Sequence, residues 1–161
     1  MNEKLDWIED HAIKSLLSRH ENADYIARET NYVLTLLLAG GGACLGFSAV
    51  HADGEKALLA AALVTAIWLF ALGAALLIRV KNTKDFPSVY NSPKNLLSRK
   101  DLSFDDLKLA DILRIQDSID QAAAIVFDRS LILNSIQRYS CATPIVSIVS
   151  YTIAWAITAF A

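Results

Sequence analysis

Hydrophobic and polar positions divide the chain into three long apolar runs separated by charged segments. The first two runs, residues 32–50 and 57–80, are separated only by the short polar sequence HADGEK. The third run covers residues 141–161 and carries no charged side chain. At about 1.5 Å of rise per residue, a helix formed by each run can cross a hydrocarbon core of about 30 Å. The pattern therefore predicts three transmembrane helices, the first two joined as a hairpin.

A soluble helical bundle is the alternative to a membrane protein. Helices of soluble proteins usually keep one polar stripe that faces water. Residues 58–78 have only the Thr65 hydroxyl and the Trp68 indole N–H as polar side-chain groups. Hydrophobic residues make up 54% of the chain, and the mean hydropathy is +0.35, which is high for a soluble domain. Both observations favour a membrane protein.

Residues 1–31 are predicted to form an amphipathic helix. Leu5, Ile8, Ala12 and Leu16 recur at spacings of three and four, which places them on one helical face. Such a helix lies on the membrane surface or packs against another helix outside the membrane. Helices that lie on membranes are usually rich in Lys and Arg, whereas acidic residues dominate the first turns here. The charges therefore favour packing against another helix.

Residues 81–140 are predicted to start as a loop and to continue as a helix. Two prolines and several asparagines indicate irregular structure over residues 81–100. Ser103, followed by Asp106 three residues later, is similar to a capping box and marks a helix start. The apolar positions that follow recur at helical spacing: Leu109, Ile112, Leu113, Ile119, Ala123, Val126 and Ile136. The segment is therefore one long helix, or two in line, leading into the third apolar run.

These elements predict an all-α membrane protein with three transmembrane helices and a cytoplasmic helical layer. Pro144 lies near the start of the third apolar run, where it either begins a new helix or kinks a continuous one. The expected segments are an N-terminal amphipathic helix, a transmembrane hairpin, a cytoplasmic loop with a long helix, and a third transmembrane helix, at residues 1–31, 32–80, 81–140 and 141–161.

The distribution of Lys and Arg predicts the orientation of the spans. Of the 15 basic residues, all but Lys56 lie before residue 32 or between residues 79 and 140. Cytoplasmic loops carry the excess of positive charge. We therefore expect an N-terminus in the cytoplasm and a C-terminus in the periplasm of a bacterial inner membrane.

The first apolar run contains a face of small residues. Gly42 and Gly46 form a GxxxG pair, and Ala39 and Ala43 form a second small pair beside it. Small residues allow two helix backbones to approach closely inside a bilayer. The face packs either against the second span of the same chain or against another copy of the protein, as a homo-oligomer contact. Consecutive glycines also weaken the helix, which indicates a segment able to bend.

The apolar runs carry no ionisable group that would serve transport or catalysis. Residues 32–50, 58–78 and 141–161 contain no Asp, Glu, Lys, Arg or His, whereas proton-coupled transporters normally hold such a group in the membrane. The sequence has no nucleophile elbow, phosphate-binding loop or metal-ligand spacing. We therefore expect no enzyme activity, no cofactor and no metal site, and the net charge of −2 gives no indication of a nucleic-acid partner.

Basic residues of the predicted cytoplasmic helix are candidates for binding a small anionic ligand. Arginine pairs well with phosphate through parallel hydrogen bonds. The same spacing is also typical of any solvated helix on the positive side of a membrane. The candidate residues are Arg114, Arg129 and Arg138.

The layout of the chain resembles small bacterial transmembrane effectors of antiphage signalling, such as the Pycsar membrane effector. The resemblance rests on a short first helix with Trp7-Ile8, on Asn22-Ala23-Asp24 before the first span, and on a two-span hairpin followed by a helical cytoplasmic segment and a third span. An Asp-x-Lys-Ala step of the family is replaced here by Glu29-Thr30-Asn31-Tyr32. The resemblance implies a membrane-disrupting effector triggered by a cyclic nucleotide.

Together these features predict a non-enzymatic membrane protein that self-associates and perturbs or permeabilises the inner membrane. Its expected partners are the lipid bilayer, further copies of itself and, through the resemblance, a cyclic nucleotide. Two alternatives remain. A phage holin has a similar size and span count but usually shorter loops, and an accessory subunit would bind a different membrane protein and conduct nothing.

Overall fold

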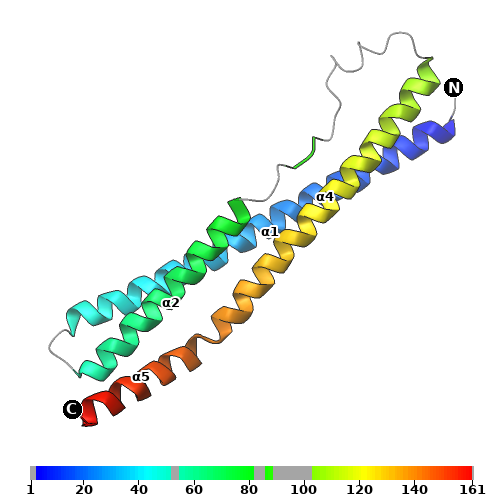
Figure 1. Ribbon diagram of the computed structural model, residues 1–161. Coiled ribbons are helices and arrows are strands. Elements are labelled where there is room, and N and C mark those ends of the chain that lie inside the picture. The colour runs from blue at the N-terminus through cyan, green and yellow to red at the C-terminus, as the bar shows by residue number, and fades with distance from the viewer. Residues whose placement is uncertain (1–2, 52–54, 82–85, 89–102, 161) are drawn as a thin grey trace. The chain divides into compact units, whose positions relative to one another are not determined.

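Helices are the only regular secondary structure in the described part of the chain. The computed structural model describes residues 3–51, 55–81, 86–88 and 103–160. These described residues form the helices α1 (Glu3–Val50), α2 (Lys56–Lys81), α4 (Phe104–Cys141) and α5 (Thr143–Phe160), shown in Figure 1. Three stretches are long and apolar enough to cross a membrane, namely α1, α2 and the α4–α5 stretch. The all-helical fold with three apolar helices of spanning length is therefore confirmed.

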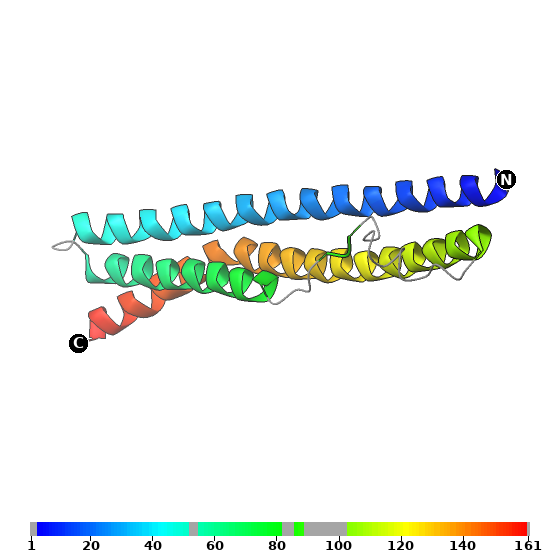
Figure 2. The ribbon, with the colours of Figure 1, turned by 90° about the horizontal axis from the view of Figure 1, so that it is seen from above.

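The predicted amphipathic helix and first span form one helix of 48 residues. Figure 2 shows α1 as an uninterrupted ribbon, and no described residue has a positive φ. Its buried positions Leu16, Ala23, Thr30 and Leu37 follow one another at intervals of seven. This is the heptad spacing of helices that pack side by side along a seam. The three consecutive glycines therefore leave the helix continuous, because packing along the seam outweighs their low helix propensity.

Two compact units divide the chain. The first unit consists of Met1–Ala27 and Thr83–Arg129, and the second consists of Arg28–Asn82 and Ser130–Ala161. The predicted loop over residues 81–100 lies largely outside the described residues. Lys81 instead ends helix α2, and residues 86–88 are not helical.

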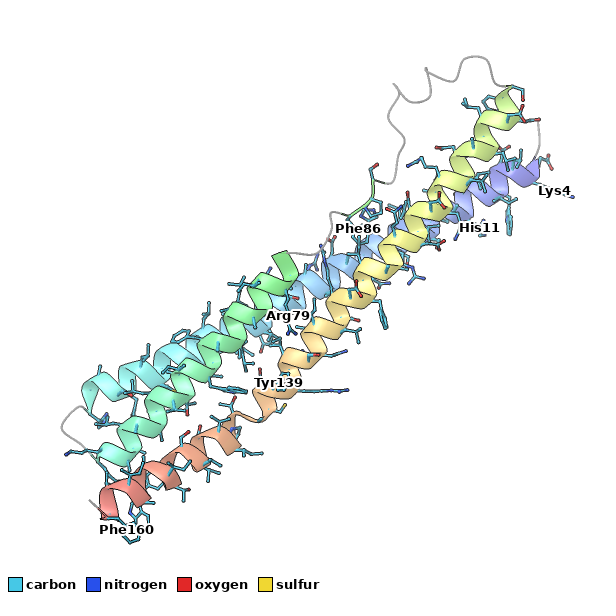
Figure 3. The ribbon with its side chains drawn as sticks, in the orientation of Figure 1. Lys4, His11, Arg79, Phe86, Tyr139 and Phe160 are labelled. Carbon is cyan, nitrogen blue, oxygen red and sulfur yellow. The ribbon has the colours of Figure 1, made fainter. Side chains whose placement is uncertain are left out.

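The first unit is a helix pair with a small apolar core. Leu16 of α1 is fully buried against Ile115, Ile119 and Ala122 of α4. Phe86, labelled in Figure 3, packs against this cluster together with two residues of α1, Ala12 and Ile13. The N-terminal helix therefore packs on α4, as the packing alternative predicts.

The buried face of α4 differs in part from the predicted stripe. Ile112, Ile119 and Ile136 are buried, but Leu109 is 49% exposed and Leu113 is 60% exposed. The helical spacing of these residues correctly predicted a helix, but it does not separate two neighbouring faces of a long helix. Heptad spacing does separate them, and it includes positions that the prediction missed: Ile115, Ala122 and Leu133.

The start of α4 is capped as the sequence predicts. The Ser103 hydroxyl oxygen accepts a hydrogen bond from the Asp106 amide at 3.2 Å and donates to Oδ2 of the Asp106 carboxylate at 2.6 Å. Asp106 stands at the position of the Glu or Gln of a capping box, but its carboxylate accepts from the Ser103 hydroxyl instead of the Ser103 backbone N–H. The helix begins at Phe104 because this cap satisfies backbone N–H groups that lack partners within the helix.

Pro144 begins a new helix rather than kinking a continuous one. Helix α4 ends at Cys141 and α5 begins at Thr143, so the chain changes direction at Ala142, as Figure 1 shows. The Ala142 amide donates to the Tyr139 carbonyl at 3.1 Å, which closes the last turn of α4. Proline fits the first turn of a helix because its missing N–H would have no partner there.

The second unit joins α2 to α5 and to the later part of α1. The buried face of α2 includes Ala61, Ala66, Leu69 and Leu76, with Ala66 and Leu76 at 0% exposure. Helix α5 packs against α2 but contains no fully buried residue. Its large apolar side chains stay outward, as expected for a helix that faces lipid or another protein.

Candidate functional site

The small-residue face of α1 is open in this chain. Ala39, Gly42, Ala43 and Gly46 are all exposed. A Cβ atom built on Gly42 or Gly46 would meet no atom within 4 Å. The four residues lie at spacings of three and four, so they form one continuous strip along the helix. The face does not pack against the second span of its own chain, and its contact with another copy stays a prediction.

Two neighbouring glycines provide the packing inside the chain instead. A Cβ on Gly40 would lie 3.2 Å from Cδ1 of Leu69, and a Cβ on Gly41 would lie 3.0 Å from Cζ of Phe70. Gly41 is therefore in close contact with α2, on a different side of α1 from Gly42. The GxxxG spacing did not reveal this contact. The feature of the sequence that could have predicted this contact is the presence of two large residues, Leu69 and Phe70, at the same depth on the facing helix.

A pair of hydroxyl groups connects two apolar helices of the second unit. Oγ1 of Thr65 on α2 lies 2.9 Å from Oγ of Ser147 on α5. Oγ1 of Thr65 also lies 2.8 Å from the Ala61 carbonyl oxygen, and Oγ of Ser147 lies 3.0 Å from the Thr143 carbonyl oxygen. Each hydroxyl has one proton, so one of the two donates across the pair and the other donates to the carbonyl of its own helix. The hydroxyl–hydroxyl contact was missed because sequence alone does not tell which faces of α2 and α5 meet.

A shallow groove extends from this hydroxyl pair along α2 and α5. Its volume is about 330 Å³, and near one end the Tyr151 hydroxyl donates to Oε1 of Glu55 at 3.2 Å. The groove is lined mainly by small or apolar residues: Cys44, Leu58, Ala61, Ala62 and Ile148. The arrangement holds α5 against α2 at two polar points.

The three arginines proposed for ligand binding do not converge. Arg114 and Arg129 are about 22 Å apart along α4, and Arg138 lies about 13 Å further on, from the rise of one helix. Nε of Arg114 donates to Oδ1 of Asp111 at 3.1 Å. Among the described side chains, Nε of Arg129 is buried without a hydrogen-bond partner, whereas Arg138 is exposed. Each arginine therefore sits in its own surroundings on one helix.

An ion-pair cluster that the sequence did not suggest joins the helices of the first unit. Nζ of Lys108 on α4 contacts the carboxylates of two α1 residues, Asp6 and Glu9, with 2.9 Å to Oε2 of Glu9. These hydrogen bonds, first with Asp6 and then with Glu9, raise the pKa of Lys108 above its usual 10.5. The cluster holds the start of α4 to the start of α1.

A histidine of the first unit contacts the short non-helical segment. Nε2 of His20 lies 3.1 Å from the Pro87 carbonyl oxygen, so this nitrogen carries the donated proton. The His20 ring also meets the Phe86 ring edge-on, with centroids 4.5 Å apart. His20 therefore holds residues 86–88 against α1. No group of three or more metal-ligating side chains gathers within the described ranges.

Comparison with known proteins supplies no relative for this chain. It matches no protein-family model, no curated protein and no solved structure.

Proposed function

We propose that this protein is a non-enzymatic integral membrane protein that self-associates and permeabilises a bacterial inner membrane. The observation that carries the proposal is the open small-residue face of α1. Ala39, Gly42, Ala43 and Gly46 are exposed, and nothing lies within 4 Å of a Cβ on either glycine. The chain thus contains a surface for close helix approach that its own helices leave uncovered.

The physical reason for self-association is the weak hydrophobic driving force inside a bilayer. Helices associate there through close packing and hydrogen bonds, because lipid tails are as apolar as leucine side chains. A strip of small residues brings two backbones into contact and favours a second copy with the same strip. In the proposed topology the N-terminus is cytoplasmic and the C-terminus periplasmic, in keeping with the Lys and Arg distribution.

The proposal includes control from the cytoplasmic side. The first unit pairs α1 with α4 through the Lys108 cluster and the core around Leu16. Helix α1 is one continuous helix and also carries the small-residue face. A ligand that alters the packing of α1 on α4 therefore acts on the same helix that makes the proposed contact between copies. A cyclic nucleotide is the trigger that the resemblance to antiphage effectors implies.

Self-association is tested with leucines on the small-residue face. The double variant Gly42→Leu, Gly46→Leu covers the face, and the matched control Ala71→Leu, Ala74→Leu adds two leucines at exposed positions of α2. Subunit number is measured by single-molecule photobleaching in lipid nanodiscs. We expect the first variant to be monomeric and the control to keep the subunit number of the natural protein. An oligomer that survives the first variant would exclude this face as the contact.

Permeabilisation is tested separately in liposomes that hold a potassium gradient and a potential-sensitive dye. We expect the reconstituted natural protein to dissipate the potential, alone or after addition of cyclic nucleotides, and the Gly42→Leu, Gly46→Leu variant to leave it intact. A stable oligomer that leaves the potential unchanged under all these conditions would contradict permeabilisation. It would favour an accessory subunit, which in turn predicts co-purification with a different polypeptide.

A further inference from the structure

The end of α4 has a polar outer side within the second unit. Asn134 and Arg138 are exposed and lie four residues apart, so they share one side of the helix. Leu133 and Ile136 are buried on the other side. Within the described ranges, Arg138 forms no ion pair. The packing of the chain therefore leaves an arginine and an amide on the uncovered side of this helix.

The hydroxyl pair of Thr65 and Ser147 determines how deep Arg138 lies relative to α2. The two helices of the pair run antiparallel, as Figure 1 shows. Arg79 follows Thr65 by 14 residues, which is about 21 Å at 1.5 Å per residue. Arg138 precedes Ser147 by 9 residues, which is at most about 14 Å along the same direction. Arg138 is therefore nearer the hydroxyl pair than Arg79 by about 7 Å, and Figure 3 shows the next residue, Tyr139, short of the level of Arg79.

Under the proposed topology, this level lies inside the hydrocarbon core. A core of about 30 Å takes about 20 residues of helix, and the apolar residues 58–78 of α2 match that length. The edge of the core then lies near Ile78, and the Arg138 backbone lies about 6 Å inside it. A charged side chain at such a depth is costly unless it reaches water or a partner. The sequence did not reveal this, because Arg138 precedes the third apolar run.

We infer that Arg138 lines the aqueous path of the assembled protein and makes this path selective for small inorganic anions. The inference rests on the proposed function, because the path exists only where copies associate in a membrane. Rings of Arg or Lys side chains select anions in channels. Associated copies repeat Arg138 at one depth, each with the Asn134 amide one turn away towards the cytoplasm. Water in the path relieves the cost of the charge, and the charge attracts anions.

The inference is tested by the reversal potential of the full chain in planar bilayers under a potassium chloride gradient. We expect chloride to be more permeant than potassium through the natural protein. Arg138→Gln lowers the chloride-to-potassium permeability ratio by about fivefold, Arg138→Glu inverts the preference, and Arg138→Lys keeps it. The control Lys4→Gln removes an exposed positive charge at the start of α1 and leaves the ratio unchanged.

The outcomes separate this inference from the proposed function. The absence of any current, with and without cyclic nucleotides, would overturn permeabilisation and this inference together. A current that favours potassium would overturn this inference alone. So would a current whose ion preference is the same in the natural protein and in Arg138→Gln.

A second measurement distinguishes an aqueous path from a lipid-facing arginine whose side chain extends to the head groups. In a background with Cys44→Ala and Cys141→Ala, Arg138→Cys is treated in liposomes with a membrane-impermeant thiol reagent. We expect this thiol to react. The control Ile145→Cys, at a position of α5 that is 64% exposed, faces lipid and stays unmodified. An Arg138→Cys thiol that stays unmodified, in a variant with natural helical circular dichroism and subunit number, would overturn the inference.

Discussion

The side-chain hydroxyls of Thr65 and Ser147 lie 2.9 Å apart and form a direct polar link between α2 and α5. Thr65 is buried and stands in an otherwise apolar stretch of α2, whereas Ser147 is one of several hydroxyl-bearing residues of α5. Without their partners, the hydroxyls would still bond to carbonyls of their own helices. The link therefore adds specificity to the α2–α5 contact at a modest gain in stability.

A double-mutant cycle measures this link. Thr65→Val and Ser147→Ala remove the two hydroxyls with little change of shape, and we expect a coupling of about 0.6 kcal/mol, with an upper limit of about 1.7 kcal/mol. Unfolding in mixed micelles, followed by circular dichroism, gives the free energies. Thr152→Val is the control partner, since its hydroxyl donates only to the Ile148 carbonyl of α5. The control cycle therefore combines Thr65→Val with Thr152→Val. A coupling energy in this control cycle equal to that of the Thr65–Ser147 cycle would contradict a specific Thr65–Ser147 interaction.

Adjacent glycines are expected to respond oppositely to alanine. Gly42→Ala adds a methyl group in open space and gains up to about 1 kcal/mol of helix propensity. Gly41→Ala places its Cβ 3.0 Å from the Phe70 ring, so we expect it to be less stable than Gly42→Ala by about 1 kcal/mol. The same micelle unfolding experiment compares them. Adding Phe70→Leu to Gly41→Ala should restore the loss, and equal stabilities of the two alanine variants would refute the contact.

The Lys108 cluster predicts a stability change at alkaline pH. Because the pKa of Lys108 is raised above 10.5 in the folded state, its contribution is fully present below that value and is lost as the pH rises through the folded pKa. We expect the difference in melting temperature between natural protein and Lys108→Met to shrink between about pH 10 and about pH 12. Lys14→Met is the control, because its pair with Asp10 is largely exposed and contributes little. A constant difference over this range would contradict the role assigned to Lys108.

The cap of α4 predicts a local loss of stability. Ser103→Ala removes the acceptor for the Asp106 amide, so we expect α4 to lose about 1 kcal/mol, with faster amide hydrogen exchange confined to its first turn. Ser135→Ala changes a serine whose hydroxyl donates to the Leu131 carbonyl towards the end of α4 and should leave the first turn protected. Unchanged exchange at Asp106 in Ser103→Ala would show that the cap contributes nothing.

Local features were the part of the fold that sequence reasoning predicted well. The Ser103 cap depends on residues within one turn of the start of α4. Pro144, by contrast, was compatible with a new helix and with a kink, and the structure shows a new helix that begins at Thr143. The exposed Leu109 and Leu113 show where such reasoning ends. Which face of a long helix is buried depends on a packing partner that is far away in sequence. Short-range periodicity alone does not tell which of two neighbouring faces is the buried one.

The site was predicted in part for the same reason. The small residues of α1 were identified from their spacing, but not the fact that Gly41 packs on Phe70 whereas Gly42 stays open. Lys108 was missed as a contact of Asp6 and Glu9 because about a hundred residues separate the partners. The three arginines of α4 share a charge type but not a location, since a continuous helix keeps them apart.

The division of the glycine triplet between two sides of α1 has an evolutionary consequence. A mutation at Gly41 disturbs the packing of each single chain, so selection against it operates whenever the protein folds. Under the proposed self-association, a mutation at Gly42 is selected against only where two copies meet. Folding and assembly can therefore diverge independently, although the codons that govern them are adjacent in the gene.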